Sequence, residues 1–506
     1  MGEISERLDA MFRLHSLTSV NHPILGSIHL VFCNEYYLGQ SIYASVVIGA
    51  NGIGKSYFLR ALAEIFCCLE ALKQEKEITA LRYYFKLSYS SHWQSYEFAN
   101  FRDINPARQS QRRFTNFVFI CDGKETNARQ MSLPRRVIAS STTINDKYVA
   151  KSTNMYRYKG LRNENSPSTT GTRTMVRKTV ESLLSSLDEK YGFRIELRRL
   201  LEDLQLQPRL ELSYNLRYKD VFVKEWMTSN ELINIFEHQR GLFKRKTDIW
   251  GTGNFKTIKE KDPWKLDEAA SLLSRLALRG IGNGRQLLKY ELLEADPKVA
   301  EDREGLKVLT SLDLLSYPTL KVYKSGDEYT FDQSSSGESS LLCQMVGIMS
   351  DIEPNSLVLI DEPENSAHPN WQINYIGWLR KIFMQYPSCH FVISTHSHFM
   401  LTDLEPNSSD IVALEKKGGI VRDVSEGVNT FNWSVDDILY RVFHVRNTRN
   451  YVLESKMLEL YRMVSGRSNE KQKLNELIGE LSQYQLNNED PLLKLLKTAK
   501  SYVESI

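Results

Sequence analysis

The stretch that decides the fold is residues 41–66, SIYASVVIGANGIGKSYFLRALAEIF. It contains a short apolar run, Ala44 to Ile48, of the kind that forms a buried strand. The segment GANGIGKS, from Gly49 to Ser56, follows at once, and apolar residues then recur at helical spacing as far as Phe66. A strand, a glycine-rich loop and a helix in this order predict an α/β fold.

The loop is a complete G-x-x-x-x-G-K-S motif, a pattern that binds the phosphates of a nucleotide. Glycine allows positive φ, so successive N–H groups can point at phosphate oxygens, and the helix N-terminus adds the positive end of its dipole. Lys55 would neutralise the β- and γ-phosphates, and the Ser56 hydroxyl would bind Mg²⁺. The predicted nucleotide-binding residues of this loop are Asn51, Gly52, Ile53, Gly54, Lys55, Ser56 and Tyr57.

A second apolar run, Leu357 to Ile360, ends at an acidic pair, Asp361 and Glu362. Ligands of open α/β sheets bind at the carboxyl ends of the strands. Asp361 suits a Mg²⁺ site, and Glu362 suits the base that polarises an attacking water. A helix is predicted over residues 371–385, followed by the strand HFVIST and His396. A strand–helix–strand crossover places both strand ends in one crevice, where His396 can reach the γ-phosphate.

A serine-rich stretch, QSSSGESSLLCQ (residues 333–344), precedes the acidic strand. Its composition alone is typical of a flexible linker. However, apolar residues follow at helical spacing, so a helix from Ser339 onward would point its N-terminus at an anion. Ser336, Gly337 and Glu338 lie where ATPases of the ATP-binding-cassette type have their signature motif, and this resemblance implies that the three residues bind the nucleotide.

The bulk properties are those of an ordinary globular protein. The chain has 506 residues, 42% of them apolar, which is enough for two to four domains. A net charge of +3 does not indicate nucleic-acid binding, which would need local patches. The six cysteines lack zinc-type spacing, which favours free thiols in a reducing compartment. No secretory signal or run of about 18 apolar residues is visible, so we expect a soluble cytoplasmic protein.

The region between the two halves of the site is long and mixed. FKLSYSSHWQSYEF (85–98) and FTNFVFICDG (114–123) predict strands of a sheet lobe, whereas MVRKTVESLLSSLDEKYG (175–192) and LDEAASLLSRLALRG (266–280) predict amphipathic helices. PRRVIASSTTINDKY (134–148) predicts a strand and a polar loop that could approach the nucleotide. No heptad pattern indicates a long coiled coil.

Two stretches of this middle region combine basic and aromatic residues. Residues 147–178 hold eight basic residues against one acid, and residues 240–265 hold eight against three. Such stretches suit contact with a DNA or RNA backbone, but a solvated insertion fits them equally well. Arg157 or Arg162 could instead face the nucleotide.

The last part of the chain is predicted to be helical, after a hairpin over residues 414–427. Two apolar stripes indicate helices that pack on the rest of the chain or on a partner. The residues of the stripes are Leu453, Met457, Leu460, Tyr461 and Val464, and then Leu474, Leu477, Ile478 and Leu481.

The motifs together resemble the ATP-binding-cassette (ABC) type of ATPase. The resemblance rests on the phosphate loop, the Ser-Gly pair, LVLIDEPE (357–364) and ISTHS (393–397). DEPENSAHP (361–369) is similar to the overcoming-lysogenisation-defect (OLD) and AAA-type prokaryotic ATPases, because transporters end this segment in Leu-Asp. The chain also looks like the PtuA-like ATPases of Septu antiphage defence systems, which pair with a separate HNH nuclease.

The resemblance implies a P-loop NTPase head with a mixed or parallel sheet, an antiparallel lobe, a helical insertion and a helical C-terminal tail. It implies ATP and Mg²⁺ as cofactors and a head-to-tail dimer or higher oligomer, in which Ser336 and Gly337 complete the site of the opposite subunit. The predicted divisions are 1–130 (first ATPase half), 131–325 (helical insertion), 326–425 (second ATPase half) and 426–506 (helical tail). Gln130 is a candidate for the glutamine loop of such ATPases.

The function expected from this resemblance is ATP hydrolysis that senses or regulates a partner nuclease in antiviral defence. Neither a Toprim nor an HNH pattern is visible, so nuclease activity is not expected in this chain. Two alternatives stay open, a stand-alone DNA-repair or recombination ATPase that clamps DNA, and a scaffold that binds ATP with little turnover.

Overall fold

The structure of the protein is a computed structural model. It divides into two compact units, Met1–Asn432 and Trp433–Ile506. The described residues are 11–33, 41–78, 81–102, 116–162, 171–187, 190, 192–217, 219–238, 248–281, 287–294, 296–417, 420–423, 430, 433, 435, 437–438, 451–466, 470–483 and 491–505.

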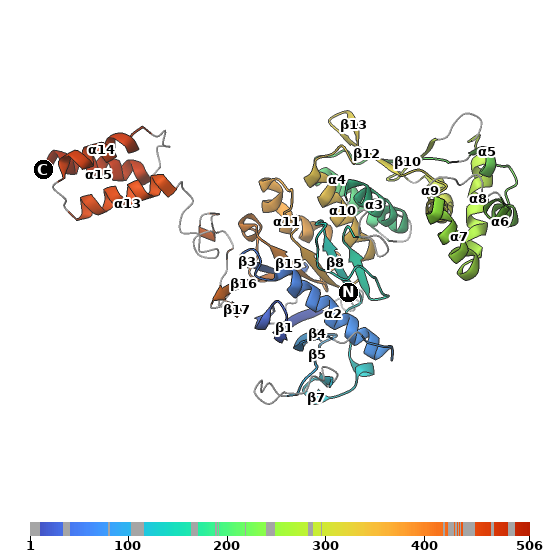
Figure 1. Cartoon of the computed structure of the whole chain (residues 1–506), viewed down its shortest axis with the longest axis horizontal. Helices are drawn as coiled ribbons and strands as arrows, with labels where there is room; N and C mark the ends of the chain where they lie inside the picture. The colour runs from blue at the N-terminus through green and yellow to red at the C-terminus, as the bar shows by residue number, and fades with distance from the viewer. Residues whose placement is uncertain are drawn as a thin grey trace, which may run out of the picture. The chain divides into compact units, whose positions relative to one another are not determined.

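The first unit is organised around a seven-stranded sheet with the order β17-β16-β3-β15-β14-β8-β9 (Figure 1). All neighbours are parallel except β16 and β17, which form the predicted hairpin. The central strands are buried and largely apolar because both faces of the sheet are covered. The strands are β3 (Tyr43–Gly49), β8 (Val137–Ser141), β9 (Tyr156–Lys159), β14 (Leu357–Asp361), β15 (His390–Thr395), β16 (Ser409–Lys417) and β17 (Ile420–Asp423).

A second, antiparallel sheet forms the predicted lobe, with the order β2-β1-β4-β5-β6-β7. Its strands are β1 (Arg13–His22), β2 (Gly26–Val31), β4 (Tyr84–Ser91), β5 (Gln94–Ala99), β6 (Val118–Cys121) and β7 (Lys124–Glu125). A parallel sheet with an antiparallel lobe confirms the predicted mixed α/β fold class.

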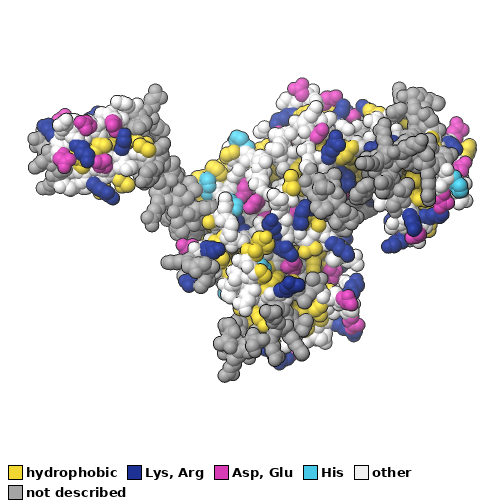
Figure 2. Space-filling model, viewed as in Figure 1, with side chains coloured by type: hydrophobic (Ala, Val, Ile, Leu, Met, Phe, Trp, Pro, Cys, Tyr) yellow, Lys and Arg dark blue, Asp and Glu magenta, His cyan; other side chains and the backbone are white. Residues whose placement is uncertain are grey.

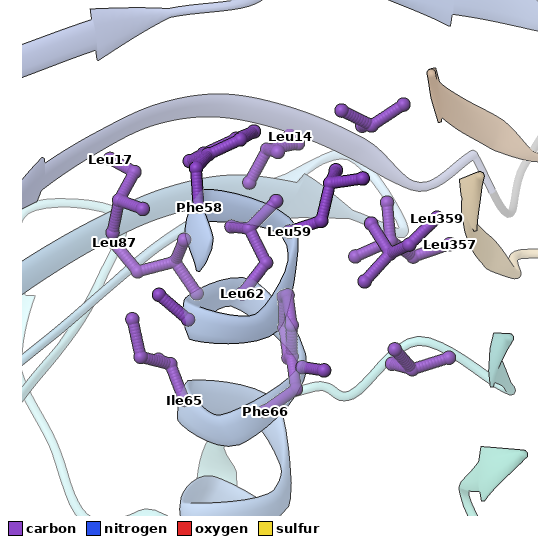
Figure 3. Close-up of a cluster of buried hydrophobic side chains, with 14 of the residues drawn as sticks. Leu14, Leu17, Phe58, Leu59, Leu62, Ile65, Phe66, Leu87, Leu357 and Leu359 are labelled. Carbon is purple, nitrogen blue, oxygen red and sulfur yellow. The ribbon is translucent and has the colours of Figure 1, made fainter. Parts of the chain in front are cut away.

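Helix α2 (Lys55–Lys73) packs between the lobe and the central sheet, and its buried face is the centre of the core (Figure 3). Fully buried side chains such as Phe58, Leu62 and Phe66 each contribute roughly 1.5–3 kcal/mol to folding. The core side chains labelled in Figure 3 are Leu14, Leu17, Phe58, Leu59, Leu62, Ile65, Phe66, Leu87, Leu357 and Leu359. This packing fixes the start of α2, and therefore the phosphate loop, against the strand ends.

The chain between β9 and residue 336 contains both helices and a four-stranded sheet, β11-β10-β12-β13. The helices are α3 (Thr172–Ser186), α4 (Phe193–Asp203), α5 (Lys219–Phe222), α6 (Ser229–His238), α7 (Asp248–Lys261), α8 (Trp264–Leu278) and α9 (Pro297–Ser311). The strands are β10 (Leu210–Asn215), β11 (Leu287–Glu291), β12 (Thr319–Lys324) and β13 (Asp327–Thr330). The predicted division at residues 131–325 stays a prediction. Strands β8 and β9, which fall in that range, belong to the central sheet.

Two further helices, α10 (Ser336–Asp351) and α11 (Pro369–Ile382), connect the strands of the site. Helix α10 begins three residues before the predicted Ser339, because Ser335 caps it and accepts a hydrogen bond from the Glu338 N–H. Helix α11 begins at Pro369 and ends at Ile382, so the predicted bounds of 371–385 are wrong by a few residues at each end. His368 caps its start, and proline is favoured at the first helical position.

The described part of the second unit includes the helices α13 (Tyr451–Ser465), α14 (Lys471–Leu481) and α15 (Pro491–Ser505), with a small core of their own. The second predicted stripe is buried in this core together with Leu460 of the first stripe, whereas Tyr461 of the first stripe is 59% exposed. Among the described residues, no helix has the length and apolar character needed to cross a membrane.

Candidate functional site

The phosphate loop runs from β3 to the first turn of α2, as its sequence predicts. Gly52 and Gly54 have φ values of 76° and 110°, which L side chains rarely adopt. A Cβ atom at Gly54 would also lie 2.5 Å from Cδ2 of Leu25, in the turn between β1 and β2. The Ile53 side chain is buried in the core, so only its backbone is available to a phosphate. The lobe therefore holds the loop in the conformation that its glycines permit.

Lys55 is almost completely buried at the start of α2. Its Nζ donates a hydrogen bond to the Gly49 carbonyl at 2.8 Å and lies 2.8 Å from Nε2 of His396. Burial lowers the pKa of the Lys55 ammonium to about 8, and the carboxylates of Glu362, Glu364 and Asp361 oppose that shift. A bound phosphate would add negative charge beside this desolvated cation and so stabilise its protonated form.

Ser56 and Asp361 come together from α2 and the end of β14. The Ser56 hydroxyl donates to Oδ1 of Asp361 at 3.1 Å, and the Ser394 hydroxyl donates to the same oxygen. Burial raises the pKa of Asp361 to about 6, against the effect of these two hydrogen bonds. A hydroxyl and a carboxylate beside a phosphate loop are the oxygen ligands that Mg²⁺ prefers, so these residues fit that ion.

Glu362 and His396 follow the ends of β14 and β15. Nε2 of His396 lies 3.4 Å from Oε1 of Glu362, and the Asn365 side chain donates to Oε2 at 3.1 Å. The hydrogen bond from His396 lowers the pKa of Glu362, so the carboxylate is ionised at neutral pH. Glu362 has a φ of 48°, an uncommon value for a residue with a side chain. Such strain is often found where a side chain must be held in a functional position.

Glu364 and Ser394 also belong to this site, although the sequence motifs predicted no role for either residue. Oε1 of Glu364 accepts a hydrogen bond from the His396 N–H, which fixes the backbone that carries the imidazole. Ser394 pairs with Asp361 across β14 and β15, so both side chains leave the sheet on the same face. Both residues lie in the motifs DEPE and ISTHS, which the sequence analysis singled out. Their contacts, however, follow only from the pairing of β14 with β15.

The loop after β8 reaches the nucleotide site from the other side of β14. The last residue of β8, Ser141, pairs with Asp361, and Nζ of Lys147 lies 6.0 Å from the centre of the Tyr57 ring. The approach of residues 134–148 to a nucleotide stays a prediction. Gln130, in contrast, lies in the short helix η1 (Ala128–Gln130), which contacts α2 near Lys73, at the end away from the phosphate loop.

Tyr148 of this loop has a buried hydroxyl with no hydrogen-bond partner among the described residues. Because an unpaired buried hydroxyl is destabilising, Tyr148→Phe is expected to leave the free energy of unfolding unchanged or to raise it by about 1 kcal/mol. Urea denaturation measures this change. Tyr158→Phe is the matched control, since its hydroxyl donates to Asp146 at 2.6 Å and its loss is expected to cost about 1–2 kcal/mol. Equal destabilisation by both variants would contradict the assignment.

The predicted Ser-Gly-Glu segment forms the first turn of α10. Ser336 is exposed, whereas the Glu338 side chain accepts hydrogen bonds from the Ser335 N–H and from Lys324. Gly337 is buried, and a Cβ atom there would lie 2.5 Å from the carbonyl oxygen of Ser366. The segment thus packs against the loop that follows the acidic pair, with Ser336 facing solvent. Its predicted contact with a nucleotide stays a prediction.

The described residues of the two basic stretches form many ion pairs within the chain. Arg157 and Lys159 both pair with Asp351, and Arg162 pairs with Asp146 at 2.7 Å. Three lysines of the second stretch form the pairs Lys256–Glu260, Lys259–Glu237 and Lys265–Asp262. Residues 163–170 and 240–247 of these stretches lie outside the described residues. Figure 2 shows basic and acidic side chains interspersed over the visible face, and nucleic-acid contact stays a prediction.

Comparison with known proteins identifies the kind of domain. Residues 164–401 match the family model described as "AAA domain, putative AbiEii toxin, Type IV TA system". Over this range the chain is similar to that family of AAA domains. The matched range contains the Ser-Gly segment, the acidic pair and His396, while the phosphate loop lies before it.

The chain also has a distant relative among characterised proteins. The Septu protein PtuA of Bacillus thuringiensis is 26% identical over 188 residues, which cover 34% of this chain and 46% of that protein. The match therefore spans less than half the length of that relative.

Among solved structures, a Smc head domain from Pyrococcus furiosus, bound to the C-terminal domain of ScpA, has a TM-score of 0.33 and 10% identity. That comparison covers 86% of this chain and all of the other. The SMC head domain from Thermotoga maritima has a TM-score of 0.33 and 9% identity over 82% of this chain and 100% of that one.

Proposed function

We propose that the ATPase domain binds ATP with Mg²⁺ and hydrolyses it to ADP and phosphate. The observation that supports this most strongly is the convergence of cation, hydroxyl and acids at the carboxyl ends of adjacent parallel strands. Lys55 and Ser56 follow β3, Asp361 ends β14, and His396 follows β15. This edge is where open α/β sheets bind their ligands.

The residues of the site would have two roles, binding the phosphates with Mg²⁺ and activating the attacking water. Lys55 and the N–H groups of the loop would bind the β- and γ-phosphates, while Ser56 and Asp361 would hold Mg²⁺. When bound, the metal ion neutralises the charge that develops on the phosphate oxygens. Glu362 is ionised and partly exposed, so it can accept a proton from an attacking water. The His396 imidazole lies between this base and Lys55, which places it to contact the transferred phosphate.

Replacing Lys55 with alanine is expected to weaken ATP binding by about a hundredfold. The variant loses a charged hydrogen-bond donor in a desolvated site, where such contacts contribute about 1.5–3 kcal/mol. Equilibrium titration with ATP and Mg²⁺ measures the change. Lys73→Ala, at the far end of the same helix, is the matched control and should bind as the wild type does. If Lys55→Ala bound ATP with unchanged affinity, the phosphate loop would not be the nucleotide-binding site.

The domain is further proposed to act as a head-to-tail dimer or higher oligomer. Ser336 lies exposed at the N-terminus of α10, where backbone N–H groups and the helix dipole favour an anion. In a dimer of this kind, Ser336, Gly337 and Glu338 of one copy would complete the nucleotide site of the other. Of these, the Glu338 side chain is engaged in the helix cap, so its backbone would make the contact.

The biological role that we propose is the sensing or regulation of a partner nuclease in antiviral defence. Support comes from the similarity to the Septu protein PtuA, which matches over part of both chains. The test is to purify the chain together with the products of its neighbouring genes and to determine the mass of the complex. A stable complex with a nuclease is expected. A chain that purifies alone and whose hydrolysis is stimulated by DNA would contradict this role.

A further inference from the structure

A cavity of about 620 Å³ lies in the insertion, among α3, α7, α9 and the segments that follow β10 and α9. Its volume falls within the range of about 300–1,000 Å³ that is common for small-molecule sites. The residues that form it belong to none of the elements that carry Lys55, Ser56, Asp361, Glu362 and His396. The nucleotide site described above therefore does not account for this cavity.

One part of the cavity wall is apolar. Val180 and Leu184 are one helical turn apart on the same face of α3, and both side chains are almost fully buried. Tyr214 and Pro318 add further buried apolar surface from β10 and from the segment before β12. Such a surface can pack against a flat or hydrocarbon part of a ligand.

The polar residues of the wall carry more positive than negative charge. Arg177, Arg217 and Lys307 come from three different elements, against Glu181 and Asp313. Arg217 pairs with Asp313 at 2.6 Å, whereas Arg177 is 3.7 Å from Glu181. These side chains are all partly exposed, so a ligand can replace water around them.

Lys307 provides the excess positive charge of the wall. It pairs with Glu304, which is not part of the cavity wall and also pairs with Arg303. An anionic group at this edge of the cavity could therefore pair with Lys307, because Lys307 shares its carboxylate partner Glu304 with Arg303. Asn254 also lines the cavity; its amide donates one hydrogen bond to the Ser311 carbonyl at 2.8 Å and has a second N–H.

We propose that this cavity binds a small organic anion that has an aromatic or otherwise apolar body. The body packs on Val180, Leu184 and Tyr214, and the anionic group faces Lys307 and Arg217. Helix α3 also contacts α10, where the Cys343 thiol lies 3.8 Å from the Met175 carbonyl. A ligand in the cavity is thus one helix away from the segment that contains Ser336.

The test uses 8-anilinonaphthalene-1-sulfonate, which combines an aromatic body with one anionic group. The full chain is titrated by calorimetry with ADP in excess, so that the nucleotide site is occupied. One saturable site per chain is expected. Ser311→Trp, which fills the cavity, should weaken binding by about tenfold or more, and Lys307→Met should weaken it by about fivefold. Lys298→Met, an exposed lysine at the start of the same helix, is the matched control and should bind like the wild type.

Circular dichroism and ATP binding establish that the variants are folded. Lack of saturable binding by the wild-type chain would overturn the proposal. Equal affinity in wild type, Ser311→Trp and Lys307→Met would overturn it as well, because the probe would then occupy another surface. Neither result bears on ATP hydrolysis, so this inference and the proposed function can fail separately.

Discussion

Glu362→Gln is expected to lower the rate of ATP hydrolysis by about a hundredfold to ten-thousandfold while ATP still binds. Glutamine has nearly the same shape as glutamate but cannot accept a proton from water, and general-base catalysis contributes rate factors of this size. ATP binding should survive because Lys55, Ser56 and Asp361 are unchanged. The hydrogen bond from Asn365 can persist, because the glutamine amide oxygen also accepts.

Phosphate release under single-turnover conditions measures the rate, and equilibrium titration measures the affinity. Glu415→Gln, an exposed glutamate on β16, is the matched control and should hydrolyse ATP at the wild-type rate. A Glu362→Gln variant with full activity would show that another group activates the water. A wild-type chain that binds ATP without turnover would instead favour a scaffold that holds ATP structurally.

Ser336→Arg is expected to abolish hydrolysis without weakening ATP binding by a single chain. The Ser336 side chain is exposed at the first position of α10, so arginine fits there without disturbing the core. In the proposed dimer, however, this surface lies against the nucleotide of the other copy. A long side chain at that place would displace the first turn of α10 from this nucleotide, so the site could not hydrolyse it.

The measurements for Ser336→Arg are the mass in solution with ATP present, the ATP affinity and the rate of hydrolysis. Ser501→Arg adds the same side chain to an exposed position of α15 and is the matched control, expected to behave as the wild type does. Parallel loss of affinity and rate in Ser336→Arg would mean that the residue acts on its own chain's nucleotide. Normal hydrolysis would exclude the segment from the active site.

Local sequence predicted the central elements of the site because each depends on a few neighbouring residues. Strands β3, β14 and β15 are buried on both faces, so each contains a run of apolar residues, although β3 also buries Ser45 and β15 buries His390 and Ser394. The phosphate loop could be located because its glycines, Lys55 and Ser56 must follow one another at fixed spacing. These features need no knowledge of distant contacts.

Other features could not be predicted because they depend on residues far apart in the chain. Glu364 and Ser394 acquire their roles only through the pairing of β14 with β15. Arg157 and Lys159 belong to a stretch that suits contact with a DNA or RNA backbone, but both pair with Asp351, which is almost two hundred residues away. Likewise, the sheet of the insertion pairs β10 with β11 and β12 across intervening helices, which helical periodicity alone does not reveal.

A mixing experiment with two inactive variants tests whether each ATPase site is shared between two copies of the chain. The Ser336→Arg chain keeps an intact phosphate loop, and the Lys55→Ala chain keeps an intact Ser336. In a head-to-tail dimer of the two variants, these intact halves face each other. One of the two sites is then complete. If two copies share each site and the chains exchange at random, an equal mixture is expected to regain about a quarter of the wild-type rate of ATP hydrolysis. A mixture as inactive as each variant alone would contradict an ATPase site shared between two copies.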